Sequence, residues 1–319
     1  MVRILFLGTG GGRINVVKQF RSPAGFIIDG TSRIYVDPGP GAVSQAKRFK
    51  FNLERIDVLY VSHPHLDHVN DAQLVIEAMT HLTRKRRGAV IADRFVLQGS
   101  RIRERATAIA ADLVRGLTPF HVKHETFVPS ISPYHKGLVS EVHVIEPDKE
   151  IEINKMKFKG TSTHHDCPAT GFMLDIDNRR IGYTADTEYF EGLGEQFKGC
   201  DALVVNILRV TKPWKGHLYQ DTAIKFLKEA RPKKAYLTRF GGEYLRTPAA
   251  TVAKKIQDET GVETIATFDG MSVEKQIERF RKQTVPEIEE ERGARVLEAP
   301  ERKGGAAFHE LAGLRFLGG

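Results

Sequence analysis

Four side chains of the metal-ligand type stand within six positions of this chain, directly after an apolar run. The run IDVLYVS at 56–62 predicts a buried strand, and the letters HPHLDH after it supply His63, His65, Asp67 and His68. Alternate side chains of an extended stretch point the same way, so His63 and His65 can reach one ion. Asp67 and His68 follow where the chain turns toward a predicted helix, within reach of a second ion. Because zinc binds imidazole nitrogen and carboxylate oxygen, this loop is predicted to hold metal.

Further residues of the same chemistry come at the ends of other predicted strands. Two metal ions about 3.5–4 Å apart can clamp the attacking and leaving oxygens of a hydrolytic displacement. One loop supplies only part of such a site, so the other ligands are expected at neighbouring strand ends. The candidates are Asp37 at the end of RIYVD, His164 and His165 after the strand that ends at Gly160, Asp186 at the end of RRIGYTAD, and His217 in KGHLY before a predicted helix.

The order of predicted elements indicates an α/β protein. Two blocks, each of strands followed by helices, predict two sheets with helices on their outer faces. The first predicted helix has Asn70 or Asp71 as a cap at its start. The predicted strands are 2–8, 24–29, 33–37, 56–62, 138–146, 150–160, 171–176, 179–186, 201–207, 233–240 and 262–267, and the helices are 70–82, 219–230 and 248–261.

One domain is predicted over 1–275, and two segments of the chain, one within this domain and one after it, differ from the rest in composition. Residues 99–140 contain an amphipathic helix pattern at 101–117 and then three prolines, and we interpret them as an insertion over the active site. Residues 276–319 are first charged and punctuated by Pro and Gly, and then mildly apolar at 306–317. They are predicted to be a linker and a C-terminal arm that docks or contributes to a homo-oligomer.

Composition and charge narrow the class of protein. Apolar residues at 41% and charged residues at 28% are typical of a globular protein, and the apolar runs are too short to span a bilayer. The N-terminal letters do not resemble a signal peptide, and two cysteines make no disulfide framework, so a cytoplasmic location is expected. A net charge of +8 favours anionic partners such as phosphate esters or nucleic acid. Basic runs stand at 47–50, 84–87 and 101–105, and because charge runs without interleaved aromatics are weak evidence for nucleic-acid binding, we interpret them first as solvated faces.

These residues resemble the metallo-β-lactamase superfamily, a group of hydrolases with a four-layer αββα sandwich. The letters SHPHLDH match its His-x-His-x-Asp-His signature, and the resemblance covers about 1–275. The start LGTGGG and the stretches HHDCPATGF, GYTADT, GHLYQDTA and ETGVETIATFDGM are similar to the branch that holds ribonuclease Z and the phosphoribosyl cyclic phosphodiesterases. The resemblance therefore implies a four-layer αββα fold and a metal-dependent hydrolase.

The resemblance also implies roles for single residues. His165 is preferred to His164 as a ligand because HDCPATGF has the family's spacing from ligand to Gly-aromatic. Asp37 matches the acid that supports the histidine loop through hydrogen bonds. Zinc is the expected metal, as one or two ions, with manganese or iron as alternatives. The implied metal ligands are His63, His65 and His165 for one ion, Asp67 and His68 for a second ion, and Asp186 as the bridge.

One position departs from the family pattern. Where the family has a last histidine, the strand reads YLTRFGG with Arg239, and a guanidinium cannot ligate zinc. The second site would then be completed by water, and be weak or empty. Arg239 either holds a phosphate oxygen of the substrate, faces solvent, or pairs with a carboxylate. His217 either protonates the leaving alkoxide, as its counterpart in this branch does, or compensates for the missing ligand.

The expected function is a phosphodiesterase that acts through a metal-bound hydroxide, with Asp67, His217 and Arg239 as its catalytic groups. A small anionic phosphodiester is the expected substrate, and RNA is the alternative partner. Two other classes of function remain open. One is a thioester or lactone hydrolase similar to glyoxalase II. The other is a degenerate, non-catalytic family member, which only Arg239 supports.

Two further motifs are interpreted as structural rather than functional. The letters GTGGGR at 8–13 do not complete G-x-G-x-x-G, because Arg13 stands at the last glycine position. We therefore predict a tight turn beside the metal site rather than a dinucleotide loop. Cys167 is two residues after His165 and is either a soft metal ligand or a small packed thiol, of which the second is preferred.

Overall fold

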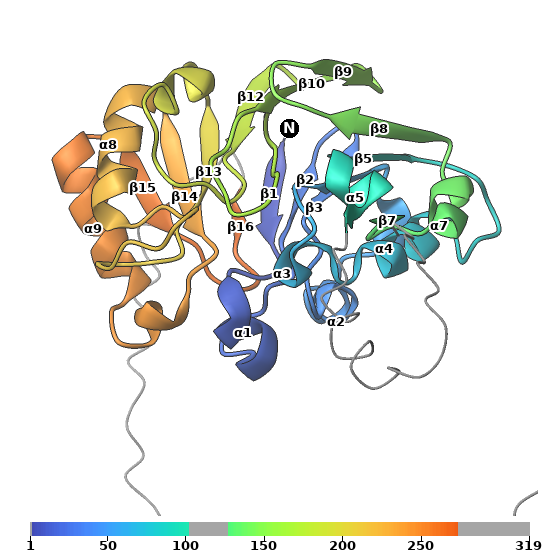
Figure 1. The fold of residues 1–319 in the computed structure, drawn as a ribbon, viewed down its shortest axis with the longest axis horizontal. Helices are drawn as coiled ribbons and strands as arrows, with labels where there is room; N and C mark the ends of the chain where they lie inside the picture. Colours follow the sequence, from blue (N-terminus) through green and yellow to red (C-terminus); the bar gives the residue numbers. More distant parts are fainter. Residues whose placement is uncertain (1, 102–126, 274–319) are drawn as a thin grey trace, which may run out of the picture. The chain divides into compact units, whose positions relative to one another are not determined.

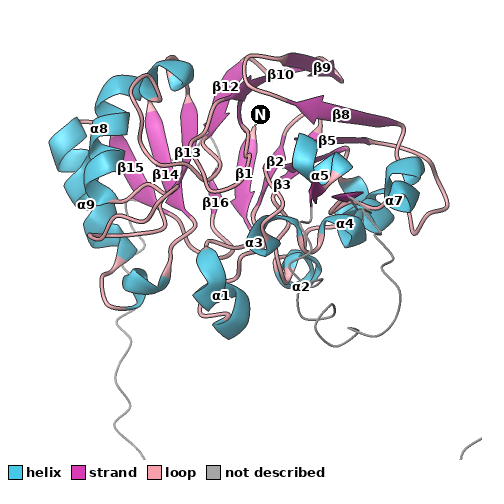
Figure 2. Cartoon of the chain, viewed as in Figure 1, coloured by secondary structure: helices cyan, strands magenta, loops and turns pink. Residues whose placement is uncertain are grey.

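Two seven-stranded sheets form the centre of the molecule (Figure 1). The computed structural model describes residues 2–101 and 127–273. The strand order is β16-β1-β2-β3-β4-β5-β8 in the first sheet and β15-β14-β13-β12-β11-β10-β9 in the second. Helices flank the sheets on their outer sides (Figure 2). The protein is therefore an α/β sandwich of four layers, αββα, as the sequence predicts.

The first sheet is antiparallel at one side and parallel at the other. β1 pairs antiparallel with β16 and β2, and β2 pairs antiparallel with β3, whereas β3, β4, β5 and β8 run parallel. Its strands are β1 (Arg3–Phe6), β2 (Phe26–Asp29), β3 (Arg33–Val36), β4 (Val58–Val61), β5 (Ala89–Asp93), β8 (Glu141–Ile145) and β16 (Ser272–Val273).

The second sheet repeats this arrangement. β9 to β12 pair antiparallel in sequence order, and β12 to β15 run parallel. Its strands are β9 (Glu150–Ile153), β10 (Met156–Thr161), β11 (Gly171–Ile176), β12 (Arg179–Tyr183), β13 (Ala202–Asn206), β14 (Lys234–Thr238) and β15 (Glu263–Ala266). A separate two-stranded ribbon consists of β6 (Ser100–Arg101) and β7 (Phe127–Val128).

Helices connect the parallel strands and cover the sheets. Those of the first half are α1 (Gly12–Lys18), α2 (Ala42–Arg48), α3 (Leu66–Val69), α4 (Ala72–Met79), α5 (Arg94–Gln98) and α7 (Pro133–Leu138), with the 3-10 turn η1 (Leu53–Arg55). Those of the second half are α8 (Gln220–Ala230) and α9 (Ala249–Thr260), with the 3-10 turns η2 (Gly194–Phe197) and η3 (Gly242–Leu245). Among the described residues, no helix has both the length and the apolar character needed to cross a membrane.

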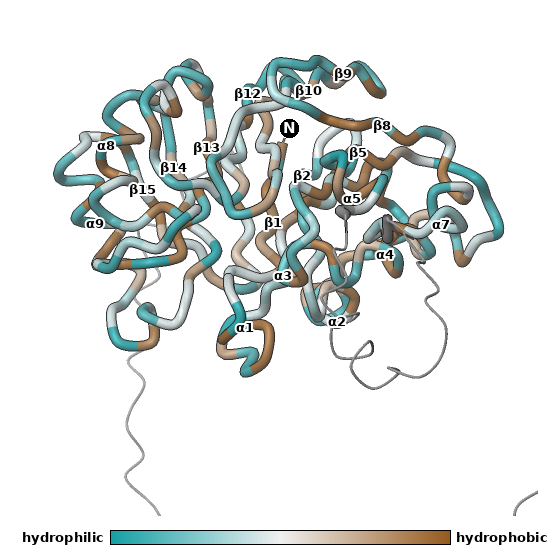
Figure 3. Tube along the Cα trace, in the orientation of Figure 1, coloured by the Kyte–Doolittle hydropathy of each residue, from teal (hydrophilic) through white to brown (hydrophobic). Residues whose placement is uncertain are grey.

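Three apolar cores hold the layers together, and strand β4 contributes to two of them. Tyr60 points between the sheets, where its ring lies 4.7 Å from that of Phe172 and 6.1 Å from that of Phe158. Leu59 and Val61 point to the opposite side and pack in the core under α2 and α4. A strand with both faces buried must be apolar throughout, which explains the run that precedes the histidine loop. A third core lies between the second sheet and α8 and α9. Hydrophilic residues gather in the loops around these cores (Figure 3).

The structure corrects the predicted start and end of the first long helix. α4 ends at Met79, because His81, Leu82 and Thr83 all have positive φ. Asp71 precedes α4 but does not cap it through its side chain. Its carboxylate instead accepts hydrogen bonds from Gly41 N at 3.0 Å and from Asn70 Nδ2 at 2.9 Å. Asp71 therefore stands at the predicted N-cap position, but its carboxylate binds the chain that enters α2 instead of the first turn of α4.

Several elements lie outside the predicted pattern, among them α1, α2, α5 and β5. α1 buries only Asn15, and α2 buries only Ala42 and Ala46, so neither shows an apolar stripe. Of the predicted insertion, the structure describes 99–101 and 127–140, where Ile131 and Val139 pack in the core of the first half. The rest of the predicted helix at 101–117, and the predicted linker and arm at 276–319, lie outside the described residues.

Candidate metal centre

The candidate ligands come from strand ends that meet at one edge of the sandwich. Asp37 follows β3, the histidine loop follows β4, His165 follows β10, Asp186 follows β12 and Arg239 follows β14. An isolated bridge between Gly10 and Phe240 joins the exits of β1 and β14 at the same edge. Parallel strands place their carboxyl ends side by side, so the fold itself gathers side chains that are far apart in sequence.

Three imidazole nitrogens converge at the centre of the site. His65 Nδ1 lies 3.1 Å from His63 Nε2 and 3.2 Å from His165 Nε2. A zinc ion with nitrogen ligands at about 2.0–2.1 Å in tetrahedral geometry needs such nitrogens about 3.3 Å apart. We call His63, His65 and His165 the imidazole triad, and its spacing fits a divalent cation.

Hydrogen bonds on the far side of two rings set their tautomers. Ser62 Oγ donates to Asp37 at 2.6 Å, so it accepts from His63 Nδ1, which lies 2.9 Å away. His165 Nδ1 lies 2.8 Å from the carbonyl oxygen of Gly216 and must carry the proton there. In its neutral form each ring then presents an unprotonated Nε2 to the triad, as a metal-binding histidine requires, and His165 Nε2 also lies 3.0 Å from the exposed carboxylate of Asp166.

Asp37 is the buried acceptor that fixes the histidine loop. Its carboxylate accepts from Ser62 N at 2.7 Å, His68 Nδ1 at 2.7 Å and Tyr183 OH at 2.5 Å, in addition to Ser62 Oγ. Tyr183 belongs to the second sheet, so Asp37 links the two sheets directly behind the site. This is the supporting position expected for Asp37, and Ser62 and Tyr183 are partners that the sequence did not single out.

His68 and Asp186 face each other beside the triad. His68 Nε2 is buried without a well-formed hydrogen bond among the described residues, and it lies 3.3 Å from Asp186 Oδ2. Burial and Arg239 disfavour its charged form, but Asp186, Asp37 and Asp67 outweigh them and raise the pKa of His68 to about 9. Burial also opposes the charge on Asp186, yet His68, above all, holds the pKa of that carboxyl well below its usual range. The pocket is thus an environment that attracts cations.

Asn206 holds the other oxygen of Asp186. Its Nδ2 donates to Asp186 Oδ1 at 2.7 Å and to Tyr183 OH at 3.1 Å. Asn206 stands at the end of β13, just as Asp37 and Asp186 follow strand ends, but the sequence prediction took only acids and histidines as candidates. His217 Nδ1 lies 3.5 Å from Asp186 Oδ2, and burial lowers the pKa of His217 although Asp186 acts in the opposite direction.

The structure separates the neighbours His164 and His165. His165 belongs to the triad, whereas the ring of His164 stacks on Phe190 with centroids 4.0 Å apart. Cys167 lies beside the triad, with Sγ 3.6 Å from His65 Nε2. Among the described residues, His63, His65, His165 and Cys167 each offer one ligand atom within 4.8 Å of the others. Burial raises the pKa of the Cys167 thiol to about 12.

Arg239 is buried and pairs with Asp67. Its side chain is 4% exposed, Nη2 lies 2.8 Å from Asp67 Oδ2, and Nη1 donates to the backbone oxygen of Asp67 at 2.8 Å. Asp67 Oδ2 also accepts from Gly12 N at 2.8 Å. Burial opposes the charge on Asp67, but Arg239 leads the groups that lower the pKa of this carboxyl below its usual value. Of the alternatives for Arg239, the structure shows the carboxylate pair.

The glycine stretch at 8–13 lies beside this pair. A Cβ at Gly11 would stand 2.6 Å from the backbone oxygen of Arg239, and one at Gly10 would stand 2.4 Å from the oxygen of Arg21. The chain there adopts a close approach that only glycine permits. The stretch therefore lies at the site, as predicted, and α1 begins directly at Gly12.

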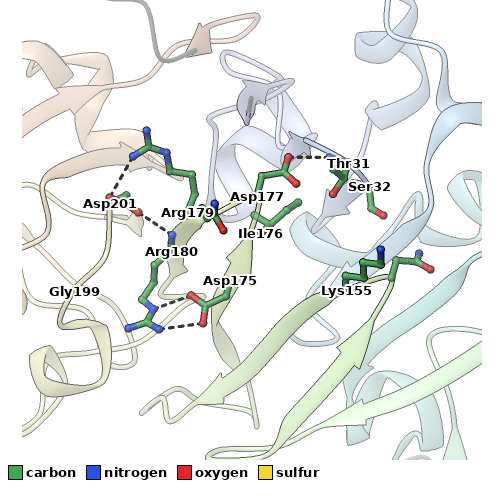
Figure 4. Close-up of a pocket in the computed structure, with 12 residues that line it drawn as sticks. Thr31, Ser32, Lys155, Asp175, Ile176, Asp177, Arg179, Arg180, Gly199 and Asp201 are labelled. Atoms are coloured by element: carbon green, nitrogen blue, oxygen red, sulfur yellow. Dashed lines mark hydrogen bonds and ion pairs between the residues drawn. The ribbon is translucent and has the colours of Figure 1, made fainter.

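Two clefts differ in their relation to the site. One of about 380 Å³ adjoins the triad and is lined by His164, His165, Cys167 and Lys215, among others. The other, of about 920 Å³, lies at the opposite ends of β3 and β12 (Figure 4). Its arginines are paired with neighbouring acids, as in Arg180 with Asp175 at 2.8 Å and Arg179 with Asp201 at 3.4 Å (Figure 4). The first cleft is therefore the candidate for substrate.

Comparison with known proteins agrees with this geometry. The family model described as beta-lactamase superfamily domain matches residues 32–240. An uncharacterized protein of Methanocaldococcus jannaschii is 32% identical over 276 residues, which cover 86% of this chain and 95% of that protein. Ribonuclease Z of Saccharolobus solfataricus is 24% identical over 264 residues, covering 76% of this chain and 90% of that protein. The structure of the short form of human tRNase Z is similar with a TM-score of 0.57 at 15% identity, covering 86% of this chain and all of that one.

Proposed function

Since the chain belongs to the family of beta-lactamase superfamily domains, we propose that it is a metal-dependent hydrolase that cleaves phosphodiester bonds. The observation that carries this proposal is the imidazole triad, whose nitrogens lie 3.1 and 3.2 Å apart, with the far sides of His63 and His165 already hydrogen-bonded. Relatives that bear the name ribonuclease Z act on the phosphodiester bonds of RNA. This supports phosphorus, rather than acyl carbon, as the centre that is attacked.

The residues divide the work of such a reaction among them. The triad and Asp186 would hold the cation. When bound, the cation supplies a Lewis acid that activates water and stabilises charge on the phosphoryl oxygens. Asp186 Oδ2 lies between His68 and His217 and orients the attacking water. His217 is within reach of the same oxygen and delivers a proton to the leaving oxygen. Arg239 is in this proposal a positioning residue, because it acts through Asp67.

The surroundings of the site favour a small anionic substrate. Lys215 lines the cleft of about 380 Å³ beside His165, where its charge suits a phosphate ester. Two arginines of the basic run at 84–87 are engaged with the fold. Arg86 Nε donates to Val139 O at 3.0 Å, and Arg87 donates to Met79 O at 2.7 Å and pairs with Asp57. Half of that run thus has a structural role, which weakens it as an RNA-binding surface.

Removal of divalent cations is expected to abolish phosphodiester hydrolysis without unfolding the chain. The reason is that the three apolar cores and the Asp37 hydrogen bonds do not involve the cation. The measurement is turnover of bis(p-nitrophenyl) phosphate before chelation, after it, and after reloading with zinc or manganese, with circular dichroism at each stage. A thioester and a lactone are assayed in parallel. If they are hydrolysed and the phosphodiester is not, the glyoxalase II-like alternative replaces this proposal, and a loaded protein without any turnover favours the non-catalytic one.

Replacement of His217 with alanine is expected to act selectively on poor leaving groups. General acid catalysis contributes about 10²–10⁴-fold, and an alkoxide needs that proton whereas p-nitrophenolate leaves without it. The variant should therefore lose about that factor on a dinucleoside monophosphate and little on bis(p-nitrophenyl) phosphate. Metal content is measured alongside. An equal loss on both substrates together with loss of bound metal would show instead that His217 is a ligand.

A further inference from the structure

The position of Arg239 is built into the backbone of the site. The guanidinium donates to Asp67 twice at 2.8 Å, through Nη2 to Oδ2 and through Nη1 to the backbone oxygen, and its residue is 3% exposed. Gly11 passes so close to the backbone oxygen of Arg239 that a Cβ there would stand 2.6 Å away. The next residue, Gly12, donates its N–H to Asp67 Oδ2. A surface arginine that happened to fall near the site would have no such enclosure.

Asp67 is consequently occupied at Oδ2, the oxygen that lies 3.7 Å from His68 Nε2. Oδ2 already accepts two hydrogen bonds, from Arg239 Nη2 and Gly12 N, each at 2.8 Å. In the described part of the chain, three groups of side chains bring ligand atoms within 4.8 Å of one another, and none of them includes Asp67. The first cation site fits its residues, as shown above. The second, as the superfamily signature implies it, does not.

The charge of Arg239 also disfavours a second cation. A guanidinium stays protonated in proteins, so the positive charge beside Asp67 is permanent. A second divalent cation between Asp67 and Asp186 would lie next to this buried charge, where little water screens the repulsion. The guanidinium neutralises the Asp67 carboxylate and holds it in place, which a second cation bound there would otherwise do.

We propose that this chain holds one divalent cation, at the imidazole triad and Asp186, and that the Arg239 guanidinium replaces the second cation of a two-metal centre. The inference rests on the proposed function, since it assumes the triad binds metal. His68 then pairs with Asp186 at 3.3 Å rather than ligating a second ion. Arg239 does not touch substrate. Hydrolysis takes place at a single cation, and the fixed charge of Arg239 stands in the place of a second cation.

The test counts ions per chain rather than activity. The full chain is stripped with chelator, dialysed against manganese or zinc, freed of loosely bound metal and analysed by mass spectrometry of the elements. We expect one ion per chain for the natural sequence and two for Arg239→His, which restores a nitrogen ligand and removes the charge. Arg239→Lys keeps a cation beside Asp67 and adds no ligand, so it should stay at one.

Each outcome bears on the proposal. Two ions in the natural chain, or one ion in a folded Arg239→His variant, would overturn it while leaving the metal-dependent function intact. No ion at all would overturn both. Because Arg239→His removes a buried pair and can fail to fold, the manganese-loaded natural chain is also examined by electron paramagnetic resonance. An isolated six-line spectrum supports the single-ion centre, and the multiline signal of a coupled manganese pair contradicts it.

Discussion

Replacing His165 with alanine lowers metal-dependent phosphodiester turnover by about a thousandfold or more, whereas replacing His164 leaves it within about twofold. Loss of one group from a centre whose members act together has effects on this scale. His165 Nε2 lies 3.2 Å from His65 Nδ1, so its removal takes one of three converging nitrogens from the cation. His164 stacks on Phe190 instead and offers the cation nothing.

The two variants form a matched pair, since they change adjacent residues of one loop. Bound metal is measured with turnover, and His165→Ala should lose both. Thermal unfolding of the chelated proteins checks that neither change acts through the fold, and the lost stacking in His164→Ala should cost only about 0.5–1.5 kcal/mol. A reversed result, in which His164→Ala loses metal and His165→Ala keeps it, would refute the assignment of the triad.

The second large effect concerns stability. Replacing Asp37 with alanine is expected to lower the free energy of unfolding by about 3–5 kcal/mol, the range for removing one partner of a buried charged pair. Asp37 is 1% exposed and accepts hydrogen bonds from Ser62, His68 and Tyr183. Without the carboxylate these donors are left buried and unpaired, each at a cost of about 1–3 kcal/mol.

Urea denaturation in the presence of chelator measures this effect, because chelation removes any contribution of bound metal. Asp29→Ala is the control, since Asp29 also ends a strand of the first sheet but pairs nearer the surface, with Arg3 at 2.5 Å and Arg33 at 3.1 Å. Pairs of that kind contribute about 0–1 kcal/mol. If Asp37→Ala lowered the free energy of unfolding no more than Asp29→Ala does, the hydrogen bonds by which Asp37 links the two sheets would not contribute to stability.

The sequence predicts most of the side chains that gather at the candidate metal centre, because they belong to a contiguous loop or stand at strand ends. Buried strands such as β4 are apolar on both faces, so their ends can be read from the run of letters, and polar residues after them are conspicuous. The four-layer fold follows from the same pattern, together with the helices α8 and α9, whose apolar stripes are complete. Elements without such a stripe, α1 and α2, escape prediction.

What the sequence does not predict is contact between distant residues. Arg239 and Asp67 are 172 positions apart, and the letter R after a strand is equally compatible with solvent, substrate or a carboxylate partner. The direction of neighbouring side chains is a similar case, because His164 and His165 differ only in the way the loop turns after β10. Asn206 was missed since an amide is a common residue at strand ends, and only the structure shows that it holds Asp186.

The imidazole triad is not equally open on all sides. The His165 side chain and His63 are fully buried, while the His65 side chain is 38% exposed and has Cys167 Sγ 3.6 Å from its outer nitrogen. The exposed side of His65 therefore carries a soft sulfur and, 3.4 Å from the same nitrogen, the carboxylate of Asp166. Thiophilic ions such as cadmium and mercury prefer the sulfur atom. Cadmium or mercury ions are therefore expected to bind first at Cys167, so the metal found at the site depends on whether the medium contains such ions.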